Sequence, residues 1–347
     1  MKVLYILLLF GLFTYACSTD QTTGKSAQNP DYLDYSGTEA ELSGGVQMIP
    51  VETEKGTFNV WTKRVGNNPD IKVLLLHGGP GATHEIFESF DSYFPKAGIE
   101  YYYYDQLGSH YSDQPMDSTL WTIEHFVEEV EQVRQALSLD SNNFYILGNS
   151  WGGILGMEYA LKYQDNMKAL IISNMVSSIP EYNKYANEVL GPQLPPEVLK
   201  EVKELEAAGD YLNPRYSELL MEHYYTEHIL RMPLEEWPNP VMRAFEHLNY
   251  DLYLHMQGPS EFGIVGDAVL KDWDRSGDLD KIKIPTLSIG AEYDTMDPDH
   301  MEWMAGQFPK GRHLHCPKGS HLAYYDDQEV YFKGVIDFIK DVNQGKL

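Results

Sequence analysis

The chain has 347 residues, of which 43% are hydrophobic, and its formal net charge is −26. This length and apolar content allow a sizeable hydrophobic core and exclude an intrinsically disordered protein. The negative charge disfavours binding to nucleic acid and to anionic membrane surfaces, because like charges repel, and it is compatible with amine-bearing substrates. No C-x-x-C or H-E-x-x-H spacing occurs, so neither a metal nor another cofactor is expected.

The N-terminal segment is expected to lie outside the folded domain. Residues 3–12 form an apolar stretch that is too short to span a bilayer, which predicts a signal peptide over residues 1–16. Cys17 follows a small residue, as in a bacterial lipoprotein cleavage site, although Thr14 stands where leucine is commonest. Cys17 is therefore expected to carry a lipid, with residues 17–44 as a tether to the membrane of the bacterial cell envelope. Ordinary secretion, with an incidental cysteine, is the alternative.

The first folded segments are predicted strands. Residues 46–51 and 57–65 should form a strand pair, and the apolar run 71–76 should be a buried strand that ends in a glycine-rich loop, residues 77–81 (HGGPG). Glycines let backbone N–H groups approach a ligand closely, because no Cβ stands in the way. The loop is therefore a candidate oxyanion-binding loop with the N–H of Gly79 as donor, and a plain turn after a core strand is the alternative.

Strands and helices alternate through the next part of the chain. Residues 122–139 carry an apolar stripe with helical spacing. The further predicted strands cover residues 99–104, 144–147, 169–172, 284–290 and 313–316. This alternation predicts an α/β fold with a mostly parallel, doubly wound sheet that has helices on both faces.

Residues 148–152 (GNSWG) follow a predicted strand directly and precede a helix-like stretch. A serine between two glycines at a strand-to-helix turn is the nucleophile elbow of the α/β-hydrolases, in which a tight turn exposes the serine. Ser150 is therefore the candidate nucleophile, and the N–H of Trp151 is the candidate second oxyanion donor. A glycine-rich turn without a catalytic role is the alternative for this motif taken alone.

Two residues near the C-terminal end complete a candidate triad. Asp294 and His321 each lie just after a predicted strand, and the chain order serine, aspartate, histidine is that of the hydrolase triad. His321 would take the proton of Ser150, and Asp294 would hold the imidazole in the required tautomer. Asp297 and Asp299 lie in the same loop as Asp294 and are the alternatives for the acid.

Between residues 178 and 262, strand-like runs are replaced by helical pieces separated by prolines. The segments 214–230 and 240–257 each begin with a proline suited to a first helical turn. We predict a helical cap, residues 178–262, inserted into an α/β core of residues 45–177 and 263–347. A cap over the nucleophile would exclude water and select the substrate.

Three segments together, residues 77–81 (HGGPG), 105–109 (DQLGS) and 148–153 (GNSWGG), resemble the proline iminopeptidases. This family of α/β-hydrolases includes the archaeal tricorn-interacting aminopeptidases. The resemblance implies a capped α/β-hydrolase fold and a serine aminopeptidase. Such an enzyme releases the N-terminal residue, often proline, from short peptides through a Ser-His-Asp triad and an acyl-enzyme.

The same resemblance extends to residues 258–262 (GPSEF) and implies that Glu261 binds the free α-amine of the peptide, with Tyr253 near the site. The tricorn-interacting members carry a second amine-binding glutamate directly after the triad aspartate, where this chain has Thr295. Asp297 could replace that glutamate, or Glu261 alone holds the amine.

Two other functions are compatible with these residues. An esterase, amidase or lactonase acting on small acyl compounds would use the same triad without an amine-binding residue. A non-enzymatic lipoprotein that binds or adheres through a hydrolase scaffold would use neither the triad nor an amine-binding residue. The sequence does not predict the oligomeric state.

Overall fold

The computed structural model describes residues 32–33 and 44–347. The expected signal peptide and Cys17 lie outside these residues, as does most of the predicted tether. Among the helices of the described residues, none combines the length and the apolar character needed to cross a membrane.

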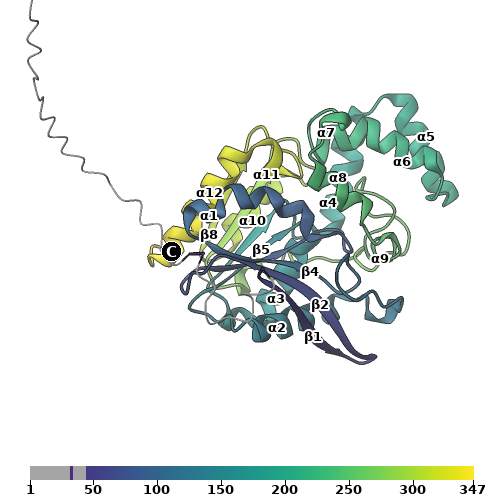
Figure 1. Ribbon diagram of the computed structural model, residues 1–347. Helices are drawn as coiled ribbons and strands as arrows, with labels where there is room; N and C mark the ends of the chain where they lie inside the picture. The colour runs from purple at the N-terminus through teal and green to yellow at the C-terminus, as the bar shows by residue number, and fades with distance from the viewer. Residues whose placement is uncertain (1–31, 34–43) are drawn as a thin grey trace, which may run out of the picture.

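A single eight-stranded sheet forms the centre of the fold (Figure 1). The strand order is β1-β2-β4-β3-β5-β6-β7-β8; β1 and β2 pair antiparallel, β2 pairs antiparallel with β4, and all other neighbours are parallel. The strands are β1 (Val46–Thr53), β2 (Gly56–Val65), β3 (Lys72–Leu76), β4 (Glu100–Asp105), β5 (Phe144–Asn149), β6 (Ala169–Ser173), β7 (Thr286–Ala291) and β8 (Gly311–Cys316). This confirms the predicted strand pair and the mostly parallel sheet of an α/β-hydrolase.

Helices cover both faces of the sheet, because the central strands are apolar on both sides. Successive residues of β3 face opposite sides of the sheet, so that Leu74 and Leu75 belong to two separate buried clusters. The first cluster includes residues of α1 (Phe94–Ala97), α11 (Ala323–Asp326) and α12 (Gln328–Asn343). The second includes residues of α2 (Ile123–Ala136), α3 (Trp151–Tyr163) and α10 (Pro298–Gln307).

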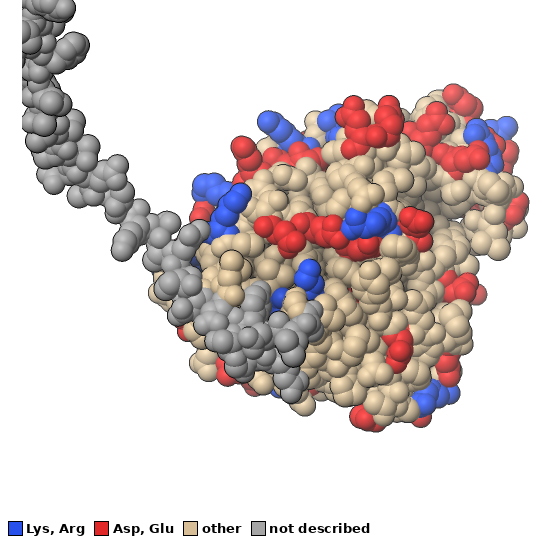
Figure 2. Space-filling view, in the orientation of Figure 1, with Lys and Arg blue, Asp and Glu red and all other residues tan. Residues whose placement is uncertain are grey.

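The helices between β6 and β7 lie together at one end of the molecule, away from the sheet (Figure 1). They are α4 (Ile179–Tyr185), α5 (Pro196–Ala208), α6 (Pro214–Leu220), α7 (Thr226–His228), α8 (Asn239–Glu246) and α9 (Tyr250–Met256), and a π-helical segment, Met221–Tyr225, joins α6 to α7. We call residues 178–262 the cap. The cap contains 15 acidic and six basic residues, and acidic side chains are prominent over these helices in Figure 2.

The helical segment expected over residues 240–257 is two helices, α8 and α9. The helix ends after α8 and restarts as α9, because Asn249 takes an extended conformation with ψ 92° and caps the new helix by accepting a hydrogen bond from the N–H of Leu252. The N–H of Asn249 donates to the carbonyl oxygen of Gly81, and its side chain donates to that of Gly108. The break therefore joins the cap to two loops of the core.

Candidate active site

The candidate residues meet at one edge of the sheet. The loop of residues 77–81 follows β3, Ser150 follows β5, Asp294 follows β7 and His321 follows β8. The carboxyl ends of parallel strands lie at the same edge, so these four segments converge although they are far apart in the sequence.

Ser150 occupies a strained turn between β5 and α3. Its backbone has φ 56° and ψ −126°, and its N–H donates to the carbonyl oxygen of Ser173 in the neighbouring strand. A Cβ on Gly148 would collide with the backbone of Gly152, and one on Gly152 would collide with the carbonyl of Leu76. The two glycines are therefore required by close backbone packing, which confirms the predicted turn geometry.

His321 and Asp294 form a buried pair. Nδ1 of His321 lies 2.7 Å from Oδ1 of Asp294, and Asp294 is fully buried. The side chain of Asn174 donates to Oδ2 of Asp294 at 2.7 Å, and the N–H of Met296 donates to Oδ1. Because both carboxylate oxygens of Asp294 accept hydrogen bonds, the carboxylate is fixed as an acceptor for the imidazole of His321. The proton of the neutral imidazole therefore resides on Nδ1, and Nε2 is free to accept another proton.

The two alternative acids do not contact the imidazole. Asp297 caps α10 by accepting a hydrogen bond from the N–H of Asp299. Of the three aspartates in this loop, only Asp294 is hydrogen-bonded to His321.

The environment raises the pKa of His321. Burial alone lowers the pKa of this imidazole, but attraction to Asp294 and the hydrogen bond between them outweigh the burial, and the charge of Glu261 adds to the increase. The imidazolium that forms when His321 accepts a proton is therefore stabilised by the buried carboxylate of Asp294.

The glycine-rich loop is held in place by a chain of hydrogen bonds to the nucleophile turn. The ring of His77 contacts the carbonyl oxygen of Gly78 through Nδ1 and accepts the N–H of Gln106 at Nε2. Burial lowers the pKa of His77, which keeps the ring neutral for these two roles. The side chain of Gln106 then accepts the indole N–H of Trp151 at 2.8 Å. The DQLGS segment thus connects the two candidate oxyanion-binding segments.

Gly79 has φ +103°, a conformation that suits glycine. Its N–H has no hydrogen-bond partner among the residues that the structure describes. A Cβ on the preceding residue, Gly78, would lie 3.0 Å from the Cβ of Ser150, so the loop runs directly against the nucleophile turn. The N–H groups of Gly79 and Trp151 are thereby available on the two segments that flank Ser150.

A cavity of about 390 Å³ lies between these segments and the cap. Ser150, His321 and Gly79 contribute to its wall from the core, and Glu261 and Tyr253 contribute from the cap. The rest of its lining is mostly apolar and aromatic and includes Ile86, Met221, Tyr225, Ile229, Ala244, Phe245, Leu248 and Tyr250. Among the described residues that line the cavity, Glu261 is the only carboxylate.

Glu261 is held by its neighbours but keeps one free oxygen. Its Oε1 accepts the hydroxyl of Tyr253 at 2.6 Å, and its backbone N–H donates to the hydroxyl of Tyr225. Its Oε2 is buried and has no hydrogen-bond partner in the described part of the chain. Burial raises the pKa of Glu261, although His321 and the Tyr253 hydroxyl act against the increase. Such a group gains stability from a cationic or hydrogen-bond-donating ligand.

Neither Thr295, which stands where the relatives have a second glutamate, nor Asp297, the candidate to replace it, adds a carboxylate to the cavity. The hydroxyl of Thr295 lies 3.2 Å from Nδ1 of His321. Asp297 caps α10 and is not part of the cavity lining. Glu261 therefore stands alone as the carboxylate of this cavity within the described chain.

Sequence reasoning missed three contributing side chains: Asn174, Gln106 and Asn249. Asn174 follows β6 directly and has φ 56°, so a polar residue just after a predicted strand was the available signal. Gln106 likewise follows β4 directly. The contact of Asn249 with the core carried no signal, because its core partners, Gly81 and Gly108, lie more than 140 residues away in the chain.

The sequence matches the model of the α/β hydrolase fold family over residues 72–328. It is 60% identical over 300 residues to a proline iminopeptidase of Flavobacterium johnsoniae, covering 86% of this chain and 100% of that protein. The crystal structure of a Mycobacterium smegmatis proline iminopeptidase covers 87% of this chain and 100% of its own, with a TM-score of 0.76 and 26% identity. The crystal structure of VinJ has a TM-score of 0.78 and 25% identity, and covers 85% of this chain and 99% of its own.

Proposed function

This chain belongs to the proline iminopeptidase family of α/β-hydrolases, and from that premise we propose that it is a serine aminopeptidase that removes the N-terminal residue, above all proline, from short peptides. The observation that carries the proposal is the carboxylate of Glu261. It has an unpartnered oxygen and lies in the wall of the cavity that also contains Ser150 and His321. An esterase for neutral substrates has no use for such a group.

In the first chemical step, the hydroxyl of Ser150 attacks the carbonyl carbon of the first residue. Nε2 of His321 takes the hydroxyl proton, and Asp294 stabilises the resulting imidazolium through the 2.7 Å hydrogen bond. The N–H groups of Gly79 and Trp151 donate to the developing oxyanion. Loss of one such donor costs about 3 kcal/mol of transition-state stabilisation, so the backbone geometry of the two loops matters as much as the triad.

In the second step, the imidazolium returns its proton to the leaving nitrogen, and the shortened peptide departs. The first residue remains as an ester on Ser150. Water, deprotonated by His321, then attacks this ester. The imidazolium returns that proton to the departing oxygen of Ser150, and the free amino acid is released.

Amine recognition would fix where the chain is cut. The protonated α-amine of proline carries two N–H bonds, and one of them can donate to Oε2 of Glu261 as a charge-assisted hydrogen bond. The hydroxyl of Tyr253 holds Oε1 and thus orients the carboxylate. The amine lies only two bonds from the scissile carbonyl carbon, so an amine bound to Glu261 brings the first peptide bond, and no later one, to Ser150.

The experiment that tests this function compares prolyl, alanyl and N-acetyl-prolyl anilides with the purified wild-type protein and its Ser150→Ala variant. We expect turnover of the free prolyl anilide, with weaker turnover of the alanyl anilide and none of the acetylated substrate. Equal cleavage of the acetylated and free substrates would instead support an esterase or amidase. A wild-type protein that neither hydrolyses an anilide nor reacts with a fluorophosphonate would point to a non-enzymatic lipoprotein.

From the sequence alone, we also propose that residues 1–16 are removed and that Cys17 carries a lipid that anchors the enzyme in the bacterial cell envelope. The support is the short apolar stretch and the cysteine that follows it. Fractionation of a bacterial host should place the wild-type protein with the membranes and a Cys17→Ser variant in the soluble fraction. The same distribution for both proteins would argue against the anchor.

A further inference from the structure

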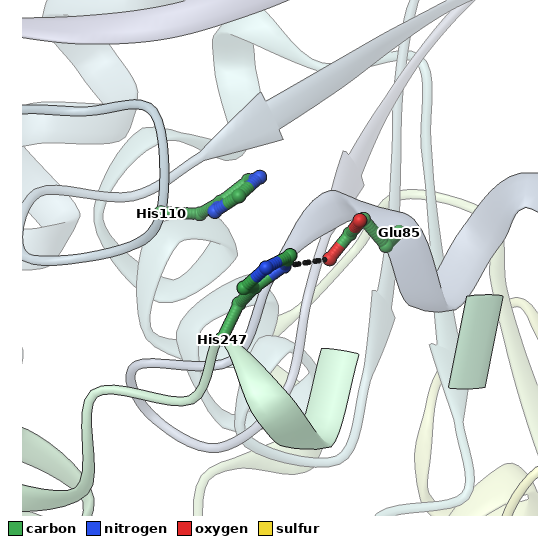
Figure 3. A group of neighbouring side chains, drawn as sticks. All are labelled: Glu85, His110 and His247. Atoms are coloured by element: carbon green, nitrogen blue, oxygen red, sulfur yellow. Dashed lines mark hydrogen bonds and ion pairs between the residues drawn. The ribbon is translucent and has the colours of Figure 1, made fainter. Parts of the chain in front are cut away.

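A second cluster of chemically active side chains lies at the junction of core and cap. It consists of Glu85, His110 and His247, each of which offers one ligand atom, and these atoms lie within 4.8 Å of one another. Glu85 belongs to the 3-10 helix η2 (His84–Ser92), His110 to the loop after β4, and His247 directly follows α8. Figure 3 shows the three side chains pointing toward one another from three separate parts of the chain.

The contacts within the cluster leave a nitrogen unsatisfied. Nδ1 of His247 lies 2.7 Å from Oε2 of Glu85, and the rings of His110 and His247 are stacked with centroids 4.2 Å apart. Nε2 of His110 is buried and has no hydrogen-bond partner in the part of the chain that the structure describes. A buried polar atom without a partner is costly in a folded protein, and a ligand that engages the ring of His110 would remove some of that cost.

Two imidazoles and one carboxylate make a donor set for divalent transition metals. Zn²⁺ in particular is bound by combinations of histidine nitrogen and carboxylate oxygen, often with water as a further ligand. Metal–ligand distances of about 2.0–2.2 Å place neighbouring ligand atoms roughly 3.3–3.6 Å apart. The widest separations in the cluster, up to 4.8 Å, would shorten by roughly 1 Å to reach this geometry, and the hydrogen-bonded pair of His247 and Glu85, at 2.7 Å, would open slightly. Side-chain rotation of His110 and His247, which are both only partly buried, can supply this movement.

The charges around the cluster favour a cation, although one positive group is present. Nε of Arg243 lies 2.6 Å from Oε1 of Glu85, but the same guanidinium also pairs with Glu88. Asp105, which accepts a hydrogen bond from His84 beside the cluster, adds another negative charge. Two carboxylates therefore pair with one guanidinium, Asp105 adds a third negative group beside the cluster, and Oε2 of Glu85 remains on the histidine side.

We propose that Glu85, His110 and His247 form a binding site for a divalent transition-metal ion such as Zn²⁺ or Ni²⁺, and that the bound ion joins the cap to the core. Two ligands come from the core and one from the cap, so the ion acts as a cross-link between them. Ile86 and Leu248, the chain neighbours of Glu85 and His247, line the cavity of the candidate active site. The ion would thus fix one wall of that cavity without touching the triad.

The test is calorimetric titration of the metal-free protein with ZnCl₂ and with NiCl₂, together with thermal unfolding. We expect one ion per chain and a melting temperature that rises with the ion and falls again with EDTA. Both effects should be lost in the His110→Ala/His247→Ala variant. The matched control is His315→Ala, because His315 also lies near a glutamate, Glu292 at 3.4 Å, but outside the cluster; this variant should bind like the wild type.

A further measurement does not depend on the folding of a variant. Electron paramagnetic resonance of the wild-type protein with one equivalent of Cu²⁺ should show hyperfine coupling to two imidazole nitrogens. The proposal is overturned if the wild type binds no stoichiometric ion, if the double variant binds as well as the wild type, or if the Cu²⁺ spectrum shows no histidine nitrogen.

Discussion

The core and the cap differ in what determines where their strands and helices begin and end. In the core, the active-site residues lie where strands end, and the strands form where the sequence is apolar, as with β6 (Ala169–Ser173) and the predicted strand 169–172. In the cap, helices stop and restart where they meet the core, as at Asn249. In the function proposed above, the core supplies the reacting side chains of Ser150, His321 and Asp294, whereas Glu261 of the cap selects the substrate. Some of the following changes alter one of these contributions alone, and others test how the core and the cap are coupled.

The largest effect is expected from Ser150→Ala, which removes the nucleophile of the core. Turnover of prolyl anilide should fall on the order of 10⁶-fold, because loss of the serine disables the whole triad. The measurement is kcat, with circular dichroism to show that the fold is retained. Residual activity above about one hundredth of the wild type would exclude Ser150 as the nucleophile.

A change in the cap, Glu261→Gln, should act on one substrate class only. Hydrogen bonds to charged groups contribute about 1.5–3 kcal/mol, so kcat/KM for prolyl anilide should fall roughly 10- to 150-fold. Hydrolysis of a neutral ester such as p-nitrophenyl acetate should change less than about twofold. Glu206→Gln is the matched control, since Glu206 is also a cap glutamate that accepts a tyrosine hydroxyl but lies outside the cavity lining. Equal losses with both substrates would contradict the amine-binding role.

The pH profile connects the two regions. The pKa of His321 is raised above its ordinary value of 6.5, so the protonated, inactive form persists to higher pH. The acidic limb of kcat/KM should therefore have its midpoint above pH 6.5 and fall tenfold per pH unit below it. Since the charge of Glu261 contributes to this increase, Glu261→Gln should move the midpoint to lower pH. A midpoint that is the same in both proteins would show that the two groups do not interact.

The smallest effect is expected from Asn249→Ala, which loosens the attachment of the cap. Loss of the helix cap and of the hydrogen bond to Gly108 should lower the free energy of unfolding by about 1–2 kcal/mol. Because the side chain of Asn249 also holds Gly108 in the DQLGS segment, whose Gln106 contacts both candidate oxyanion-binding segments, kcat should fall several-fold while the pH midpoint stays constant. Thr122→Ala is the control, as it removes only the cap of α2: denaturant titration should show a similar loss of stability, with unchanged kcat.

Much of the fold and of the candidate site could be predicted because the relevant signals are local. The tight turn at Ser150 requires glycine at positions 148 and 152, and both glycines can be read directly from the sequence. The apolar runs identify the strands that bring Ser150, Asp294 and His321 to one edge of the sheet. The resemblance to a family, rather than any local pattern, singled out Glu261.

The remainder depends on contacts between distant segments. Asn174 supports Asp294 across 120 residues of sequence, and no spacing rule predicts that partner. The break at Asn249 results from hydrogen bonds to Gly81 and Gly108, which an amphipathic pattern over residues 240–257 does not reveal. The cluster of Glu85, His110 and His247 likewise has no motif spacing, because three separate segments contribute one residue each.

The backbone around His321 has a consequence for protein engineering. The N–H groups of His321 and Leu322 donate to the carbonyl oxygens of His228 and Ile229, which lie in the cap, and the ring of His228 contacts the carbonyl oxygen of Tyr293 in the loop of the acid. A chimera that takes its cap from a relative to acquire a new specificity must therefore reproduce the path of residues 228–229. Otherwise the exchange would alter the position of His321, the proposed base, together with the substrate preference.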